Sequence, residues 1–190
     1  MKNWLKFTAA LVIGAFIFTA CETEVTLTVP GDATIDLGDD FDPKAGVTVD
    51  GAKLEDVQVF WNPAWNNELV DHYVASYSVE GETAQRNVYV RADKLTKTYQ
   101  VSDVDEDGTQ YTPYPVIVTR GTEFNELRFN ELYFNDVIVN GVINGSVLTI
   151  PQQTFQGVSI QGTGTYDGAA QKILTIDYII DGVAGTSTFD

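Results

Sequence analysis

Near the end of the chain stands the alternating segment Leu174-Thr175-Ile176-Asp177-Tyr178-Ile179-Ile180-Asp181-Gly182-Val183-Ala184. Its larger apolar side chains fall on every second residue from Leu174 to Ile180, whereas Thr175 and Asp177 fall between them. A period of two residues is typical of a strand that is buried on one face. The pair Asp181-Gly182 favours a tight turn that leads back into an antiparallel partner. This segment therefore predicts an antiparallel sheet.

The same pattern recurs upstream in the region 116–190. The apolar pairs Val142-Ile143 and Val147-Leu148 flank Asn144-Gly145, which is typical of a type I′ turn, and Asp167-Gly168 separates two further strands. Consecutive strands joined by short turns form a meander. We therefore expect residues 116–190 to form an antiparallel β-domain that is curled into a small barrel or an open clamshell.

Residues 25–95 contain a second series of short strands. Segments such as Val25–Val29, Val57–Trp61 and Tyr73–Val79 are rich in β-branched and aromatic residues, and turn residues such as Pro30-Gly31 separate them. No long window shows the apolar period of a helix. The sequence thus predicts an all-β protein, with an N-terminal β-sandwich over residues 25–95.

Both halves resemble families of bacterial surface proteins. The first half resembles surface Ig-like domains of the DUF5011 type in Leu37–Pro43, Ala45–Val47, Tyr73–Val79 and Val88–Val90. That resemblance implies an Ig-like β-sandwich and says little about function. The second half resembles the C-terminal β-domains of Bacteroidota surface lipoproteins of unknown function, in Leu148–Gln153, Gly162–Tyr166 and Leu174–Tyr178. Those families are often encoded with glycan-uptake systems, which implies a glycan-related setting.

Residues 1–20 have the layout of a secretory signal peptide. Lys2 and Lys6 precede an apolar core that is too short for a transmembrane helix, which needs about 20 residues. The core ends at Ala20, directly before Cys21, so the segment resembles a lipobox in the relaxed form found in the Bacteroidota. We expect Cys21 to be lipidated and residues 21–24 to be a lipidated tether. The alternative is a plain secreted protein with one free thiol.

The acidic start Cys21-Glu22-Thr23-Glu24 also resembles the signal that sends some Bacteroidota lipoproteins to the exterior of the outer membrane. From Cys21 to Val25 the chain spans at most roughly 15 Å, at about 3.5 Å per residue. We therefore expect an outer-membrane protein that faces the cell exterior. Its first domain should lie close to the membrane, and its second domain should be the one that meets a ligand.

The net charge limits the class of partner. Without Lys2 and Lys6 the chain carries 9 Lys+Arg against 27 Asp+Glu, a formal charge of −18. Nucleic acids and anionic lipid surfaces require a basic face, so we expect neither as a partner. A single cysteine allows no disulfide within the chain, and stability must therefore come from packed cores.

Residues 96–115 have little apolar pattern and are predicted to be an acidic linker between the domains. They contain Asp103-x-Asp105-x-Asp107-Gly108, the first half of a calcium loop. Tyr114 stands where an EF-hand needs its bidentate glutamate, so the EF-hand reading fails. A looser structural calcium site and a simple solvated linker both stay open. We expect no other cofactor.

Trp61 and Trp65 form the candidate ligand site. Their rings could make a flat platform for a sugar, with polar partners from Asn66, Asn67 and Glu68. The alternative is that Trp61 belongs to the core and that Trp65 packs the loop against the sheet.

Catalysis is not expected from this sequence. His72 is the only histidine, its neighbour Asp71 would point to the opposite face of a strand, and no nucleophile or metalloprotease motif is present. The predicted function is that of a lipid-anchored surface binding module for glycan binding or capture. The alternative is an adhesion or assembly protein that binds a protein partner and no glycan.

Overall fold

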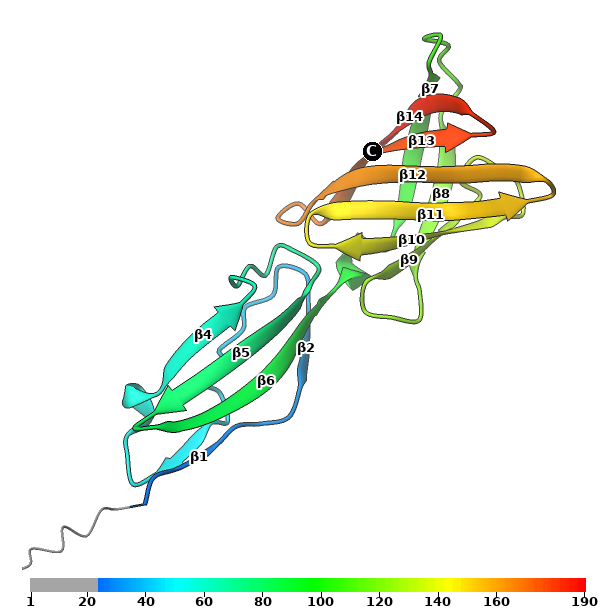
Figure 1. Ribbon diagram of the computed structural model, residues 1–190. Helices are drawn as coiled ribbons and strands as arrows, with labels where there is room; N and C mark the ends of the chain where they lie inside the picture. Colours follow the sequence, from blue (N-terminus) through cyan, green and yellow to red (C-terminus); the bar gives the residue numbers. More distant parts are fainter. Residues whose placement is uncertain (1–23) are drawn as a thin grey trace, which may run out of the picture.

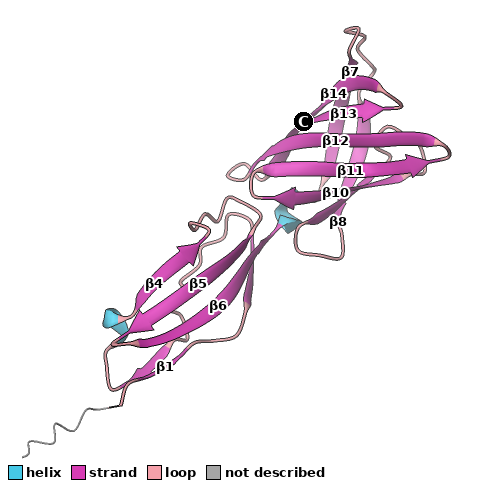
Figure 2. Ribbon diagram, viewed as in Figure 1, coloured by secondary structure: helices cyan, strands magenta, loops and turns pink. Residues whose placement is uncertain are grey.

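The structure, a computed structural model, describes residues 24–190, which form two β-domains one after the other along the chain (Figure 1). Strands and loops make up nearly all of both domains (Figure 2), and the described residues contain two short 3₁₀ helices. The predicted signal peptide 1–20, the predicted lipidation site Cys21 and residues 22–23 of the tether lie outside the described residues. Within residues 24–190, no helix is both long and apolar enough to cross a membrane.

The first domain consists of two small sheets. An antiparallel pair contains β1 (Thr26–Thr28) and β3 (Thr48–Asp50). The four-stranded sheet has the order β2 (Ala33–Asp36), β6 (Glu82–Arg91), β5 (His72–Val79), β4 (Gln58–Asn62), and β2 is parallel to β6. Two short 3₁₀ helices, η1 (Leu54–Asp56) and η2 (Ala92–Leu95), complete the domain.

A small apolar core lies between the two sheets of the first domain. It contains Ala75, Tyr77 and Val79 of β5, with Leu27 and Val49 of the two-stranded sheet packed against them. Two facing sheets agree with the coarse prediction of an all-β domain. The assignment to the Ig-like class stays a prediction.

The second domain is a closed barrel of eight antiparallel strands. Its strands are β7 (Thr98–Asp105), β8 (Tyr114–Arg120), β9 (Glu126–Asn130), β10 (Ile138–Asn144), β11 (Val147–Phe155), β12 (Val158–Asp167), β13 (Lys172–Ile180) and β14 (Val183–Phe189). Each strand pairs with the next one along the chain, and β14 pairs back with β7. The predicted antiparallel meander is therefore confirmed, and it closes completely.

Residues 96–115, predicted to be an acidic linker, instead belong to the barrel and its first connection. Residues Thr98–Asp105 form strand β7 and Tyr114–Arg120 form β8, so the barrel begins well before residue 116, and the connection between the two strands is residues 106–113. Tyr99, Val101 and Asp103 alternate toward the barrel interior, and all three are buried. Asp103 occupies the third inward position, after Tyr99 and Val101. A charged residue at this position interrupts the apolar pattern by which a strand is recognised in a sequence.

Two details of the predicted hairpins also differ. In the hairpin after β10, Asn144 pairs with Val147, so the turn residues are Gly145-Ser146 rather than Asn144-Gly145. Gly145 has a φ of 58°, and a glycine at the first turn position is the signature of a type II′ turn. Strand β13 has a bulge at Leu174, which has no pairing partner on β12. As a result Ile173, rather than Leu174 as predicted, points into the barrel and is buried.

The Asp181-Gly182 turn is as predicted. Ile180 pairs with Val183 across it, and Asp181 and Gly182 have positive φ values of 48° and 87°. Both values belong to a type I′ turn.

Tyr166 of β12 joins the two domains. Its hydroxyl accepts a hydrogen bond from the backbone N–H of Val70 (2.8 Å) and donates one to the carbonyl of Gly145 (2.6 Å). Val70 and Gly145 also form an isolated antiparallel bridge, and the Gln171 side chain donates to the carbonyl of Leu37 (3.0 Å). One apolar cluster runs from Leu37 and Val70 into the barrel. The contacts fix one end of the barrel on the first domain, and the other end points away (Figure 1).

Replacement of Tyr166 by phenylalanine tests this joint. The variant keeps the ring but leaves the buried Val70 N–H without its acceptor, so the free energy of unfolding should fall by about 1–3 kcal/mol. Urea unfolding of Tyr166→Phe beside Tyr89→Phe measures the effect. The Tyr89 hydroxyl makes no hydrogen bond within residues 24–190, so the control should be nearly neutral. Equal stability of the two variants would contradict the assigned role.

Candidate functional site

The barrel is open at the end far from the first domain. A recess of about 780 Å³, named here the distal mouth, occupies this end. Its lining residues come from strands β7, β8, β13 and β14 and from the β7–β8 and β9–β10 loops: Asp103, Asp105, Tyr111, Thr112, Tyr114, Pro115, Glu131, Tyr133, Phe134, Asn135, Tyr178, Ile180 and Val183. The volume is within the range of small-molecule sites.

The barrel interior changes from apolar to polar along its length. Toward the first domain it is filled by buried side chains such as Val101, Phe129 and Phe189, as is usual for a barrel of eight strands. Toward the distal mouth the inward positions carry Asp103 and Ser187, which are 7% and 0% exposed. Among residues 24–190 these two are the buried polar residues, so the polar layer is confined to the distal end.

Asp103 has one of its two carboxylate oxygens unpartnered. Its Oδ2 accepts a hydrogen bond from the Tyr114 hydroxyl at 2.8 Å. Its buried Oδ1 has no hydrogen-bond partner within the described chain. An unmet buried acceptor costs about 1–3 kcal/mol, and more for a charged group. The distal mouth thus holds an acceptor whose hydrogen-bonding capacity the protein leaves unused.

Tyrosines surround this carboxylate. The Tyr133 and Ser187 hydroxyl oxygens are 2.8 Å apart, and the ring centroids of Tyr133 and Tyr178 are 4.6 Å apart. Burial, and after it the hydrogen bond to Asp103, raises the pKa of Tyr114 far above its usual value. Burial likewise raises the pKa of Tyr133, and burial with the charge of Asp103 raises the pKa of Tyr178 to about 12. At neutral pH these hydroxyls are uncharged and can donate hydrogen bonds.

The β9–β10 loop turns Tyr133 into the barrel. Glu131, Tyr133 and Asp136 have φ values of 66°, 67° and 59°, a left-handed conformation that costs about 1–2 kcal/mol for residues other than glycine. Between them Leu132 is fully buried. The apolar burial of Leu132 and Tyr133 offsets the backbone cost, and the loop closes one side of the distal mouth.

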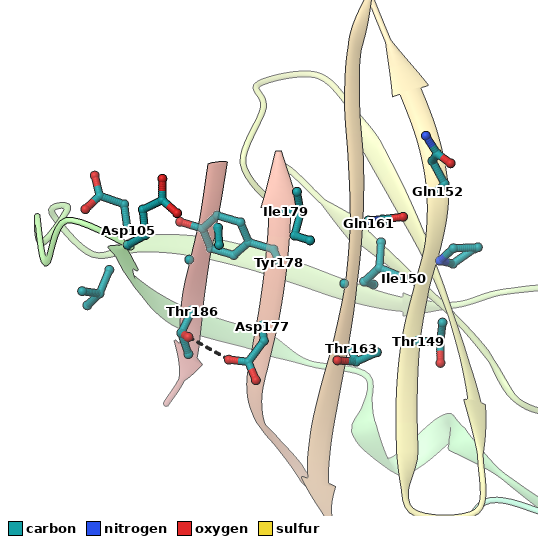
Figure 3. A pocket seen from close by; sticks show the side chains of 16 residues that line it. Asp105, Thr149, Ile150, Gln152, Gln161, Thr163, Asp177, Tyr178, Ile179 and Thr186 are labelled. Atoms are coloured by element: carbon teal, nitrogen blue, oxygen red, sulfur yellow. Dashed lines mark hydrogen bonds between the residues drawn. The ribbon is translucent and has the colours of Figure 1, made fainter. Parts of the chain in front are cut away.

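A second recess lies on the outer wall of the barrel, over β11 to β14 (Figure 3). It measures about 830 Å³ and follows a row of registered outward residues, Thr149, Thr163, Asp177 and Thr186. Thr186 donates a hydrogen bond to Asp177 at 2.7 Å. This outer groove is lined by three carboxylates, those of Asp105, Glu106 and Asp177, but among the described residues it has no buried polar atom without a partner.

Tyr178 lies between the outer groove and the distal mouth and borders both. Its ring covers Gly185 of the neighbouring strand, where a Cβ atom would overlap the ring and its hydroxyl. The glycine is therefore needed for the ring to lie there. In Figure 3 the Tyr178 hydroxyl points toward the end of β7, where Asp105 is located.

The predicted platform residues Trp61 and Trp65 do lie together. The Trp61 and Trp65 rings stack with their centroids 4.6 Å apart, and the Trp65 and Tyr73 ring centroids are 4.9 Å apart. The Phe41 ring packs beside both tryptophans. Both tryptophans are half-buried and contact the core of the first domain. Much of each ring therefore packs the loop down, and the use of the remaining edge as a sugar platform stays a prediction.

The polar residues predicted beside this platform are largely engaged elsewhere. Asn66 Oδ1 accepts the Glu68 N–H at 2.9 Å, and the Asn67 side chain donates to the carbonyl of Asp39 at 3.0 Å. Both contacts hold the loop in shape. Glu68 is exposed and its carbonyl lies next to Gly168 of the barrel. Asn66 and Asn67 therefore fix the loop within the first domain, and Glu68 lies at the junction with the barrel.

The residues of the predicted calcium loop do not converge. Asp103 lies inside the barrel, whereas Asp105 Oδ1 accepts the N–H groups of Asp107 (3.1 Å) and Thr109 (2.8 Å). Within residues 24–190, no group of three or more His, Cys, Asp or Glu side chains is placed to hold a metal ion. The acidic sequence instead forms a turn that is closed by the Asp105 carboxylate.

The single histidine has a structural environment. His72 stacks on Tyr89 with ring centroids 4.7 Å apart, and its Nε2 lies 3.0 Å from Asn87 Oδ1.

Sequence reasoning missed most of the distal mouth. Tyr114, Tyr133, Tyr178 and Ser187 come from segments that are far apart in the chain, and barrel closure brings them together. One signal was available, because Asp103 continues the alternation of Tyr99 and Val101 and thus occupies an inward position of a strand.

Replacement of Tyr114 by phenylalanine tests the buried pair. The change removes the hydrogen bond to Asp103 Oδ2, so the free energy of unfolding should fall by about 1.5–3 kcal/mol. Tyr111→Phe is the matched control, because its hydroxyl bonds the Asp105 carboxylate at an exposed position and should contribute less than about 0.5 kcal/mol. Thermal and urea unfolding of both variants measure the difference. Two equal and small effects would show that Asp103 does not depend on Tyr114.

Comparisons with known proteins give little further information. No protein-family model matches the chain, and no curated protein matches it. Among solved structures, the chain is similar to the lipoprotein BT2262 from Bacteroides thetaiotaomicron, with 14% sequence identity and a TM-score of 0.34, over 88% of this chain and 100% of that chain. This similarity assigns neither a family nor a function, and the DUF5011-type assignment stays a prediction.

Proposed function

We propose that this protein is a lipid-anchored cell-surface protein that captures a glycan in the distal mouth of its barrel. The observation that carries the proposal is the buried carboxylate of Asp103, which has one unpartnered oxygen and lies among tyrosine side chains. The role proposed is binding without turnover.

The anchor is inferred from the sequence. Lys2 and Lys6, the apolar core and Ala20-Cys21 support lipid attachment at Cys21, and a short tether leads to β1. The first domain would then lie near the outer membrane. The distal mouth lies at the end of the barrel away from that domain, so it would face outward from the cell surface (Figure 1).

The chemistry of the distal mouth suits a sugar. Sugar hydroxyls donate hydrogen bonds, and a buried carboxylate oxygen accepts charge-assisted bonds that are stronger than neutral ones. Tyrosine rings offer apolar faces for the C–H groups of a pyranose, and their hydroxyls offer further hydrogen bonds. Tyr111 is 52% exposed at the rim, where it can close over a bound ring.

A protein partner is the second candidate, favoured by one surface feature. Phe60 of β4 is 59% exposed and borders a shallow hollow with Ser76, Ser78 and Gln85. Phenylalanine is enriched at protein–protein interfaces relative to the rest of the protein surface. An adhesion role through this face would be indifferent to changes in the distal mouth.

The anchor is tested by Cys21→Ser. Loss of the thiol removes the lipid attachment, so the protein should move from the membrane fraction to the soluble fraction of the cell envelope or the medium. Thr19→Ser is the control and should keep the protein in the membrane fraction, because Cys21 is intact. A Cys21→Ser protein that stays membrane-bound would contradict lipid anchoring.

Glycan capture is tested by affinity electrophoresis on a panel of polysaccharides. Replacing the charged acceptor by a neutral one weakens a charge-assisted hydrogen bond by about 1.5 kcal/mol, so Asp103→Asn should weaken retention by roughly tenfold. The double variant Trp61→Ala/Trp65→Ala, checked for folding by circular dichroism, is the comparison and should keep its retention. Retention lost only in the tryptophan variant would move the site to the first domain. No retention of the unmodified chain would overturn glycan capture.

A further inference from the structure

We infer that the ligand of the distal mouth carries a protonated amine, which pairs with the Asp103 carboxylate against the tyrosine rings. The inference rests on the proposed function, because it assigns a chemical class to the ligand of the same site.

The charge of the distal mouth has one sign. Asp103, Asp105 and Glu131 line it, and none of the lining residues is Lys, Arg or His. A concave site with carboxylates and low-dielectric walls concentrates cations and repels anions. Acidic glycans are therefore poor ligands, and a ligand with a positive charge gains from every carboxylate of the site.

The buried state of Asp103 also favours a cation. A buried carboxylate is costly unless it is paired and fully hydrogen-bonded, and Tyr114 supplies a single neutral donor. The nearby Tyr133 hydroxyl is already engaged with Ser187. An ammonium group has three N–H donors and a compensating charge, so it can offset the charge of the Asp103 carboxylate and donate to oxygens that line the mouth.

The aromatic rings provide the second half of such a site. Tyr133 and Tyr178 lie against each other at 4.6 Å, with an interplanar angle of 54°, and both border the mouth together with Tyr111 and Tyr114. Aromatic faces attract ammonium groups, and the attraction is larger where water is excluded. In this site the carboxylate supplies the opposite charge and the tyrosine rings supply aromatic faces, and both attract an ammonium group.

Two sources can present this amine: a sugar with a free amino group, or a small amine without a sugar. Within the glycan proposal, the ligand is an amino sugar that is not acetylated. N-acetylation removes both the charge and two of the three donors, so the free and acetylated forms of one oligosaccharide differ in the feature that the site is inferred to read.

Calorimetric titration of the chain from residue 22 onward, which contains every described element of the fold, tests the inference with three probes. These are a glucosamine tetrasaccharide, its fully N-acetylated counterpart and 1,5-diaminopentane. The glucosamine tetrasaccharide should bind at least about tenfold more tightly than the acetylated one, as expected for one desolvated charge-assisted contact. Asp103→Asn should abolish this difference. Asp177→Asn, which removes the same charge from the outer wall, should keep it.

The outcomes separate the two proposals. Equal or tighter binding of the acetylated tetrasaccharide would overturn the amine inference and leave glycan capture intact. Binding of 1,5-diaminopentane alone would support the amine inference and overturn glycan capture. Binding of none of the three would overturn the amine inference. The comparison of the probes on the unmodified chain decides the result even if Asp103→Asn fails to fold.

Discussion

The pairing of β7 with β14 closes the barrel, and the distal mouth depends on this closure. The register places Ser187 opposite Asp103 and Phe189 opposite Val101, so apolar and polar inward residues of the two strands meet in matching layers. Without the pairing, β7 would be an exposed edge strand with an acidic end. With it, a carboxylate becomes buried, and the hydroxyls of Tyr114, Tyr133 and Ser187 gather around the same end of the barrel.

The two ends of the barrel differ in how they are held. At one barrel end the Tyr166 hydroxyl and a continuous apolar cluster hold the two domains together. At the other end the protein keeps a buried oxygen without a partner and a loop with three left-handed residues other than glycine. Local costs of this kind are typical of functional sites, where the surrounding structure holds residues in unfavourable states. The end that carries these costs is the one that would face away from the predicted lipid anchor.

The sequence allowed the strands and the meander to be predicted because side-chain alternation and turn pairs such as Asp181-Gly182 are local signals. It did not allow β7 to be recognised, because Asp103 breaks the apolar alternation, and only the tyrosines that surround it explain its inward position. The residue types of Trp61 and Trp65 suggested a sugar platform. Their stacking against Tyr73 and Phe41 depends on how the loop folds over the sheet, which the sequence pattern does not show. Apart from the inward position of Asp103, the distal mouth could not be predicted, since its residues meet through cross-strand register, which no single stretch encodes.

The most direct test of ligand capture at the distal mouth is a ¹H–¹⁵N NMR titration of the chain from residue 22 onward with the glucosamine tetrasaccharide. The amide signals of Asp103, Tyr133 and Ser187 report on the mouth, and the indole signals of Trp61 and Trp65 report on the alternative platform in the first domain. We predict that the mouth signals shift with saturation and that the indole signals stay in place. Indole shifts with unchanged mouth signals would contradict it.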